Sequence, residues 1–203
     1  MIKSLSGGQK AALIVNECQV GILDPRYSML PGLAAESEAR RMVPNIAAVL
    51  AAFRARRLPV FFTPALLRHD LADKVINTLI AALSAKSRSM VEGTPQSAYM
   101  PGLEPTADDF VIKRTTGLIA FHGTSLDVTL RRLGVQTLVL TGPSTNIAIP
   151  GLAMAATDLG YHVVVPEDCI AAGDAVSHRV FVENQLRFLA TISSKDEVIA
   201  ALG

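Results

Sequence analysis

Short apolar runs rich in β-branched residues alternate along the chain with longer stretches in which apolar positions recur at helical spacing. The apolar runs predict six strands, at 11–16, 59–63, 110–113, 136–141, 162–166 and 190–193. Because strands and helices alternate, we predict an α/β fold in which a six-stranded parallel sheet is covered by helices on both faces. At 203 residues the chain suits one core, so residues 1–203 are expected to form a single domain.

Proline, glycine and capping residues mark where the predicted helices begin and end. Pro44 is well placed in a first helical turn, and the TSLD sequence at 124–127 is a capping box whose helix ends at Gly134. Residues 21–35, rich in Gly and Pro, indicate a long loop, and residues 84–106 an irregular segment. The expected helices are 44–57, 71–83, 124–134, one that follows the N-cap Asn146 and ends at Leu159, 175–189 and a last short one.

The composition favours a protein with much buried surface and without a membrane or nucleic-acid partner. Hydrophobic residues make up 50% of the chain and charged residues 18%, yet no unbroken apolar run is long enough for a membrane span. We therefore expect a large core and a buried subunit interface. The net charge of +1 and the small basic clusters at 54–57 and 131–132 argue against nucleic-acid binding. The N-terminal segment lacks the apolar run of a signal peptide, which predicts a cytoplasmic location.

The cysteines and histidines do not form a metal-binding pattern. Cys18 and Cys169 are too few for a zinc site and are expected to be buried thiols. The four histidines are scattered, without an i, i+4 pair. We therefore expect neither a protein-bound metal nor another cofactor.

Candidate chemistry gathers at the carboxyl edge of the predicted sheet. The polar turn at 142–146 lies between a strand and a helix, and the first N–H groups of that helix point back into the turn. Glu17 ends the first strand and Lys113 ends the third, so right-handed crossovers bring both to the same edge. We expect them to form a charge-assisted pair in which either group can move a proton once its pKa is shifted. For each residue alone, the alternative is a strand-end side chain that faces water.

The chain resembles the isochorismatase-like, or cysteine hydrolase, superfamily over nearly its whole length. The matching segments are ALIVNECQ at 12–19, VIK at 111–113, AFHGTSL at 120–126, VLTGPSTNIAI at 139–149 and GYHVVVPED at 160–168. The resemblance implies a Rossmann-like three-layer sandwich with a six-stranded parallel sheet, assembled as a homodimer or homotetramer. Many members of this superfamily hydrolyse amides or imides of small molecules with an Asp, a Lys and a Cys. The resemblance also implies a cis peptide bond between Pro143 and Ser144.

Carried over by position, the resemblance assigns the catalytic carboxylate to Glu17, where the family usually has Asp, and the lysine to Lys113. The nucleophilic cysteine falls on Ala148, so the thiolate required for a covalent acyl-enzyme is missing. The metal-binding Asp-x-His of nicotinamidase relatives is also missing after the second strand. The candidate substrate contacts are Gln19, His122, Ser144, Thr145, Asn146 and Ile147. For several of them a structural role is the alternative: turn hydrogen bonds for Ser144 and Thr145, an N-cap for Asn146, and an exposed loop position for His122.

Three functional hypotheses follow. The first is a hydrolase that acts on a small organic substrate without a covalent intermediate, as true isochorismatases do, which also lack the cysteine. Glu17 would be the general acid/base, Lys113 would orient it, and backbone N–H groups around Ile147 and Ala148 would bind the oxygen that develops charge. The second is a ligand-binding homologue without activity. The third is an engineered Cys-to-Ala variant of a cysteine amidohydrolase.

Overall fold

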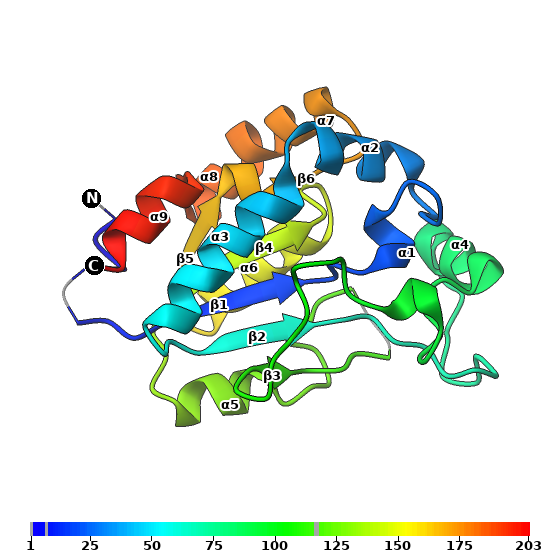
Figure 1. Cartoon of the computed structure of the whole chain (residues 1–203), viewed down its shortest axis with the longest axis horizontal. Coiled ribbons are helices and arrows are strands. Elements are labelled where there is room, and N and C mark those ends of the chain that lie inside the picture. Colours follow the sequence, from blue (N-terminus) through cyan, green and yellow to red (C-terminus); the bar gives the residue numbers. More distant parts are fainter. Residues whose placement is uncertain (1, 7, 116–117) are drawn as a thin grey trace.

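A parallel β-sheet forms the centre of the molecule (Figure 1), and its strand order reverses between β1 and β4. The computed structural model describes residues 2–6, 8–115 and 118–203. Within that part of the chain the sheet has seven strands in the order β3-β2-β1-β4-β5-β7, with β6 paired to the end of β4. The strands are β1 Ala11–Asn16, β2 Val60–Thr63, β3 Phe110–Val111, β4 Thr137–Pro143, β5 His162–Pro166, β6 Ile170–Ala171 and β7 Thr191–Ser193. The predicted α/β fold with a parallel sheet is confirmed, with the two-residue β6 as one strand more than expected.

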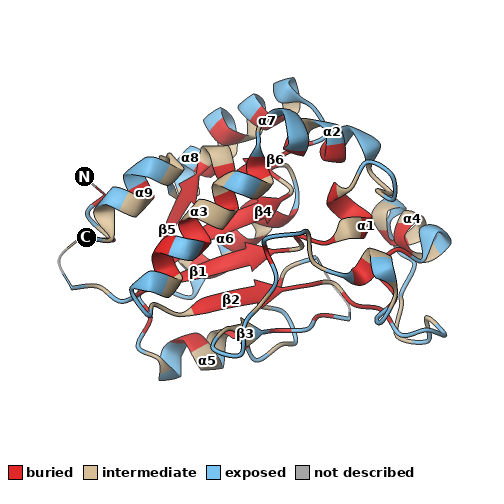
Figure 2. Cartoon of the chain, viewed as in Figure 1, coloured by how far each residue is buried: buried red, intermediate tan, exposed pale blue. Residues whose placement is uncertain are grey.

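Alternate side chains of the central strands enter two separate cores. In β1, Leu13 and Val15 belong to one core, and Ala12 and Ile14 to the other, as the two-residue period of a strand requires. The first core is covered mainly by α3 (Met42–Ala55) and α9 (Lys195–Ala201), and the second by α5 (Leu126–Arg132) and α6 (Ala148–Asp158). Figure 2 shows the strands buried and the outer helical surfaces exposed. Burial on both faces explains why β1 and β4 are apolar along almost their whole length.

Several helices differ from the sequence expectation. Residues 21–35 are not one long loop, because α1 (Val20–Leu23) and α2 (Pro31–Ala39) occupy much of that segment, and Pro31 stands at the first position of α2. The helix expected at 71–83 begins later, as α4 (Leu79–Ser87), because the side chain of Thr78 accepts a hydrogen bond from the N–H of Ala81 and caps it there.

Two further corrections concern the later helices. The capping box at 124–127 does not form: Ser125 is the N-cap residue of α5, while the hydroxyl of Thr124 donates to the carbonyl of Ala120. The helical stretch expected at 175–189 is α7 (Ala175–Phe181), a π-helical turn (Val182–Leu186) and α8 (Arg187–Leu189). The irregular segment after α4 contains a short 3₁₀ turn at Pro95–Ser97.

Candidate functional site

The strand order reverses between β1 and β4, and the ends of these strands are joined by buried polar contacts. The side-chain amide of Asn16 donates to the carbonyl of Pro143 at 2.8 Å, and its oxygen accepts from the hydroxyl of Thr63 at 2.9 Å. Gly142 passes so close to β1 that a Cβ there would lie 2.1 Å from the carbonyl oxygen of Asn16. No side chain fits at that point, so glycine is required, and the edge of the sheet is held rigidly where open α/β proteins bind ligands.

Glu17 follows β1 directly and forms an ion pair with Arg114. The Arg114 side chain is 2% exposed and that of Glu17 is 18% exposed, so the pair is largely removed from water. Burial lowers the pKa of the Arg114 guanidinium to about 10, which is still far above neutrality, and the group stays charged. The site therefore contains a carboxylate whose countercharge is supplied from the protein interior.

The predicted pair of Glu17 and Lys113 is wrong. Lys113 bonds instead to Glu92, and its side chain is 59% exposed. Beyond β3 the chain continues in extended form beside β2, with Ile112 donating to the carbonyl of Phe62 and Arg114 paired to Ala65. Successive side chains of an extended chain point to opposite sides. Because Ile112 and Arg114 point inward, Lys113 between them points outward.

The corner between β4 and α6 begins at the peptide bond for which a cis conformation is predicted. The peptide bond between Pro143 and Ser144 is cis, which confirms the prediction from the resemblance. The carbonyl of Ser144 accepts from the N–H groups of Ile147, at 3.3 Å, and Ile149, at 3.0 Å. The N–H of Ala148 has only a 3.4 Å contact with the hydroxyl of Ser144. Asn146 is not the N-cap of α6; Ile147 holds that position without a side-chain cap.

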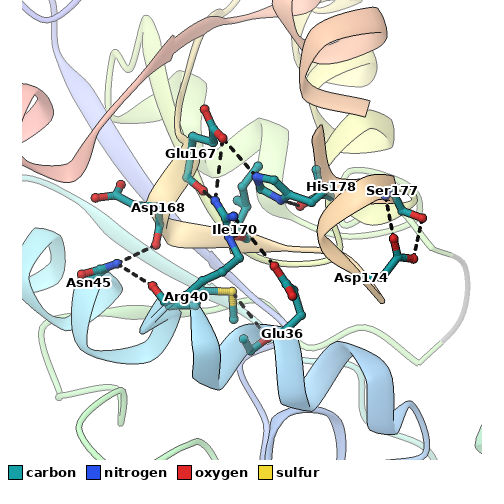
Figure 3. Close-up of polar contacts among 12 residues, drawn as sticks. Glu36, Arg40, Asn45, Glu167, Asp168, Ile170, Asp174, Ser177 and His178 are labelled. Carbon is teal, nitrogen blue, oxygen red and sulfur yellow. Dashed lines mark hydrogen bonds and ion pairs between the residues drawn. The ribbon is translucent and has the colours of Figure 1, made fainter. Parts of the chain in front are cut away.

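A polar cluster behind the corner holds Thr145 in place. The N–H of Thr145 donates to the carbonyl of Ala171, and its hydroxyl lies 3.0 Å from Nδ1 of the buried His178. On the other side of the ring, Nε2 of His178 lies 3.3 Å from Glu167, and Arg40 reaches the same carboxylate (Figure 3). Burial and the nearby Arg40 lower the pKa of His178, so the ring is held in its neutral form. Thr145 is thus a buried structural contact of the corner.

The corner and Glu17 open into one cavity of about 340 Å³. Ala148 and Glu17 both line it, with Lys74 and Asn77 on the segment before α4. Figure 1 shows α1 and α4 beyond the arrowhead of β1, where they enclose this edge of the sheet. The apolar part of the wall includes Ile22, Met29, Val75, Ile80, Met90 and Ile147. Its size suits a small organic ligand with an apolar body and a few polar groups.

The predicted substrate contacts divide into two groups. Ser144 and Ile147 line the cavity. Gln19 is fully buried, and its amide bonds to the backbone of Ala65 and the carbonyl of Ser97, so it braces loops. Thr145 faces His178. Asn146 and His122 lie outside the cavity lining, and His122 is exposed.

Neither thiol lines this cavity. Cys18 and Cys169 are both buried and free, and burial raises the pKa of each thiol, so neither is poised as a nucleophile. Within residues 2–6, 8–115 and 118–203, no group of three or more His, Cys, Asp and Glu residues could hold a metal ion. In the same ranges, no helix combines the length and the apolar character needed to cross a bilayer.

Two charged residues of the site were missed at the sequence level. The sequence indicates that residues from Ile112 onward alternate between inward and outward positions, which allows Arg114 to point inward. Which residues of that alternation point inward is set by pairing with β2 and Ala65. Lys74 had no signal, because it belongs to a segment that was expected to be helical and is not.

Comparison with known proteins identifies the family of this chain. The isochorismatase domain, as a protein family, matches residues 11–197. The isochorismatase family protein YecD of Escherichia coli O157:H7 is 32% identical over 182 residues, which are 89% of this chain and 94% of that protein. A maleamate amidohydrolase of Pseudomonas putida KT2440 is 35% identical over 83 residues, 41% of this chain and 38% of that enzyme. The crystal structure of an isochorismatase family protein from Desulfovibrio vulgaris has a TM-score of 0.82 at 29% identity, over 95% of this chain and 100% of that one. The chain therefore belongs to the isochorismatase family of hydrolases, and its relatives include an amidohydrolase.

Proposed function

We propose that this chain hydrolyses a small organic substrate by acid–base chemistry without a covalent enzyme intermediate. The observation that carries the proposal is the arrangement of three residues around one cavity. Glu17 and Ala148 line the cavity, and Arg114 pairs with Glu17 from behind. The resemblance assigns the family's nucleophilic cysteine to the position of Ala148. Without a thiol at that position, the attacking group is a water molecule.

Glu17 is the general base in this scheme, and Arg114 takes the place that was first given to Lys113. An ionised carboxylate accepts a proton from water as the water oxygen adds to the substrate carbon. The same carboxyl group then returns the proton to the leaving group as the bond to it breaks. One water is consumed, and Glu17 ends in the state in which it began. Arg114 fixes the carboxylate and its charge throughout.

The N–H of Ala148 is the donor proposed for the oxygen that gains charge. Its contact with the Ser144 hydroxyl, at 3.4 Å, is long for a hydrogen bond. The Ala148 N–H can therefore donate to a stronger acceptor on the substrate at little cost. The N–H of Ile147 is less suited, since it already donates to the carbonyl of Ser144. A donor fixed by the helix start needs no reorganisation as the charge develops.

The decisive variant is Glu17→Gln, which keeps the shape of the side chain and removes its basicity. We expect kcat/KM to fall by about 10²- to 10⁴-fold, the usual contribution of a positioned base. Maleamate is the first substrate to test, because a relative is named for its hydrolysis. Glu92→Gln is the matched control, since Glu92 belongs to the exposed pair with Lys113 and should leave activity unchanged. Circular dichroism and a melting curve establish that both variants are folded; an active Glu17→Gln enzyme would exclude the mechanism.

Ala148→Cys separates this proposal from the two alternatives, an inactive ligand-binding homologue and an engineered Cys-to-Ala variant. The proposal expects turnover by the chain as it stands. If the present chain is inert on a broad panel of amides and Ala148→Cys hydrolyses them through a trapped covalent intermediate, an inactivated cysteine amidohydrolase is the correct description. Binding without turnover by either chain would favour the inactive homologue.

Assembly into a homodimer or homotetramer is a further part of the proposal. Apolar side chains are exposed along α7 and α8, at Val176, Val180 and Phe188. A strict monomer in light scattering at micromolar concentration would contradict it. A single domain over residues 1–203 and a cytoplasmic location stay predictions from the sequence.

A further inference from the structure

The two charged side chains of the cavity lining differ in their partners. Among the described lining residues, Glu17 and Lys74 are the two that carry a charge. Glu17 has its countercharge in Arg114, which lies behind the wall. The ammonium group of Lys74 has no hydrogen-bond or ion-pair partner among the side chains that the structure describes. The cavity therefore presents one positive charge that no hydrogen bond or ion pair among the described residues neutralises, and that the adjacent carboxylate of Asp73 offsets only in part.

The surroundings of Lys74 favour a ligand that carries a negative charge. Val75 and Ile80, on the same stretch of wall, are apolar, and burial lowers the pKa of Lys74, with a partial opposing effect from Asp73. The hydroxyl oxygen of the neighbouring Thr78 already accepts from the N–H of Ala81. A partly dehydrated ammonium beside apolar side chains gains most from an anionic group that brings both charge and hydrogen-bond acceptors.

We propose that Lys74 binds a carboxylate group of the substrate, so that the natural ligand is a small organic acid with its hydrolysable group beside Glu17 and Ala148. The proposal rests on the function proposed above for the position of the reacting bond. The assignment of Lys74 itself depends only on the residues that line the cavity and not on the proposed reaction. A cavity of about 340 Å³ limits the ligand to a short carbon skeleton between the two ends.

Equilibrium binding of matched pairs of probes tests the proposal without any need for turnover. The probes are acetate, butyrate and benzoate, each compared with its primary amide, which has nearly the same shape and no charge. Isothermal titration gives Kd for each probe at neutral pH and constant ionic strength. For at least one pair we expect the wild-type protein to bind the carboxylate about tenfold or more tightly than the amide, the range for a partly buried charge pair.

Three variants assign that preference to Lys74. In Lys74→Met the carboxylate-to-amide ratio should fall to about one while Kd for the amide stays within about twofold, and in Lys74→Arg the preference should be retained. Lys86→Met is the matched control, because Lys86 lies on α4, is exposed and does not line the cavity. A preference that survives in Lys74→Met, or wild-type protein that prefers no carboxylate in any pair, would overturn the proposal.

The Glu17→Gln variant keeps this test distinct from that of the reaction. If Glu17→Gln keeps the carboxylate preference and loses turnover, the mechanism is supported and the preference does not depend on Glu17. If it keeps both the preference and full turnover, the mechanism fails, and Lys74→Met alone decides the assignment of Lys74. Loss of the preference in Lys74→Met is the outcome that only a charge contact with the ligand explains.

Discussion

The two walls of the cavity are built in different ways. The wall at the ends of β1 and β4 is held by buried polar contacts: Arg114 pairs with the lining residue Glu17, and His178 holds Thr145 behind the corner. The other wall, on residues 74–81, includes side chains that are open to solvent, such as Val75, which is 66% exposed. The first wall is part of the core, and the second is attached to it. Under the proposed function, the reacting groups belong to the rigid wall, and the proposed carboxylate contact belongs to a segment that can change at little cost to stability.

The largest effect that tests this contrast is expected from the buried ion pair. Arg114→Met should lower the free energy of unfolding by about 3–5 kcal/mol, because the Glu17 carboxylate would remain in the wall without its partner. Lys113→Met, one residue earlier, removes only the exposed ion pair with Glu92 and should change the free energy of unfolding by less than about 1 kcal/mol. Urea denaturation of both variants measures the difference. Equal losses would mean that the pairing of Glu17 is not the one described.

A smaller effect is expected from the cluster behind the corner. Thr145→Val keeps the shape of the side chain and removes its hydrogen bond to His178, which should lower the free energy of unfolding by about 1–2 kcal/mol. Chemical denaturation at neutral pH is the measurement. An unchanged free energy of unfolding would mean that the contact between Thr145 and His178 does not stabilise the corner.

The pH dependence of stability gives an independent test of the same cluster. The pKa of His178 is lowered in the folded state from its ordinary value of 6.5, by burial and by Arg40, so the unfolded chain binds more protons at acid pH. The contribution of His178 is therefore fully present above pH 6.5 and is lost as pH falls toward the folded pKa. We expect the fall in melting temperature between pH 7 and pH 5 to be shallower in His178→Gln than in the wild type. An identical profile would contradict a buried neutral histidine.

The smallest effect is expected on the exposed wall. Val75→Ala should change the free energy of unfolding by less than about 0.5 kcal/mol, because this side chain of the cavity lining is mostly in solvent already. Ile149→Ala, at the start of α6 and fully buried, should lower the free energy of unfolding by about 2–5 kcal/mol. Melting curves of the two variants compare the exposed wall with the core next to Ala148. A large loss for Val75→Ala would show that the second wall is also part of the cooperative core.

The strands and the corner could be predicted because they depend on local sequence. Residues 11–16 and 162–166 are strands with the predicted bounds, since uninterrupted apolar runs of that length suit strands buried on both faces. The helix starts were less predictable. Pro31 reads equally well as a loop breaker and as the first residue of a helix, and only its packing in α2 decides between them.

The sequence by itself determined the family, the parallel α/β sheet, a carboxylate directly after the first strand at Glu17 and an alanine at position 148. Each of these is a property of residue identity or of short apolar runs. Only the tertiary structure decided which of two adjacent basic residues meets Glu17. That choice depends on the phase in which residues 110–114 pair with β2, a contact between segments about fifty residues apart in the chain. Likewise, Lys74 lines the cavity because the non-helical segment before α4 runs beside it. Local periodicity does not encode such long-range placement, because it is set by packing against distant parts of the fold.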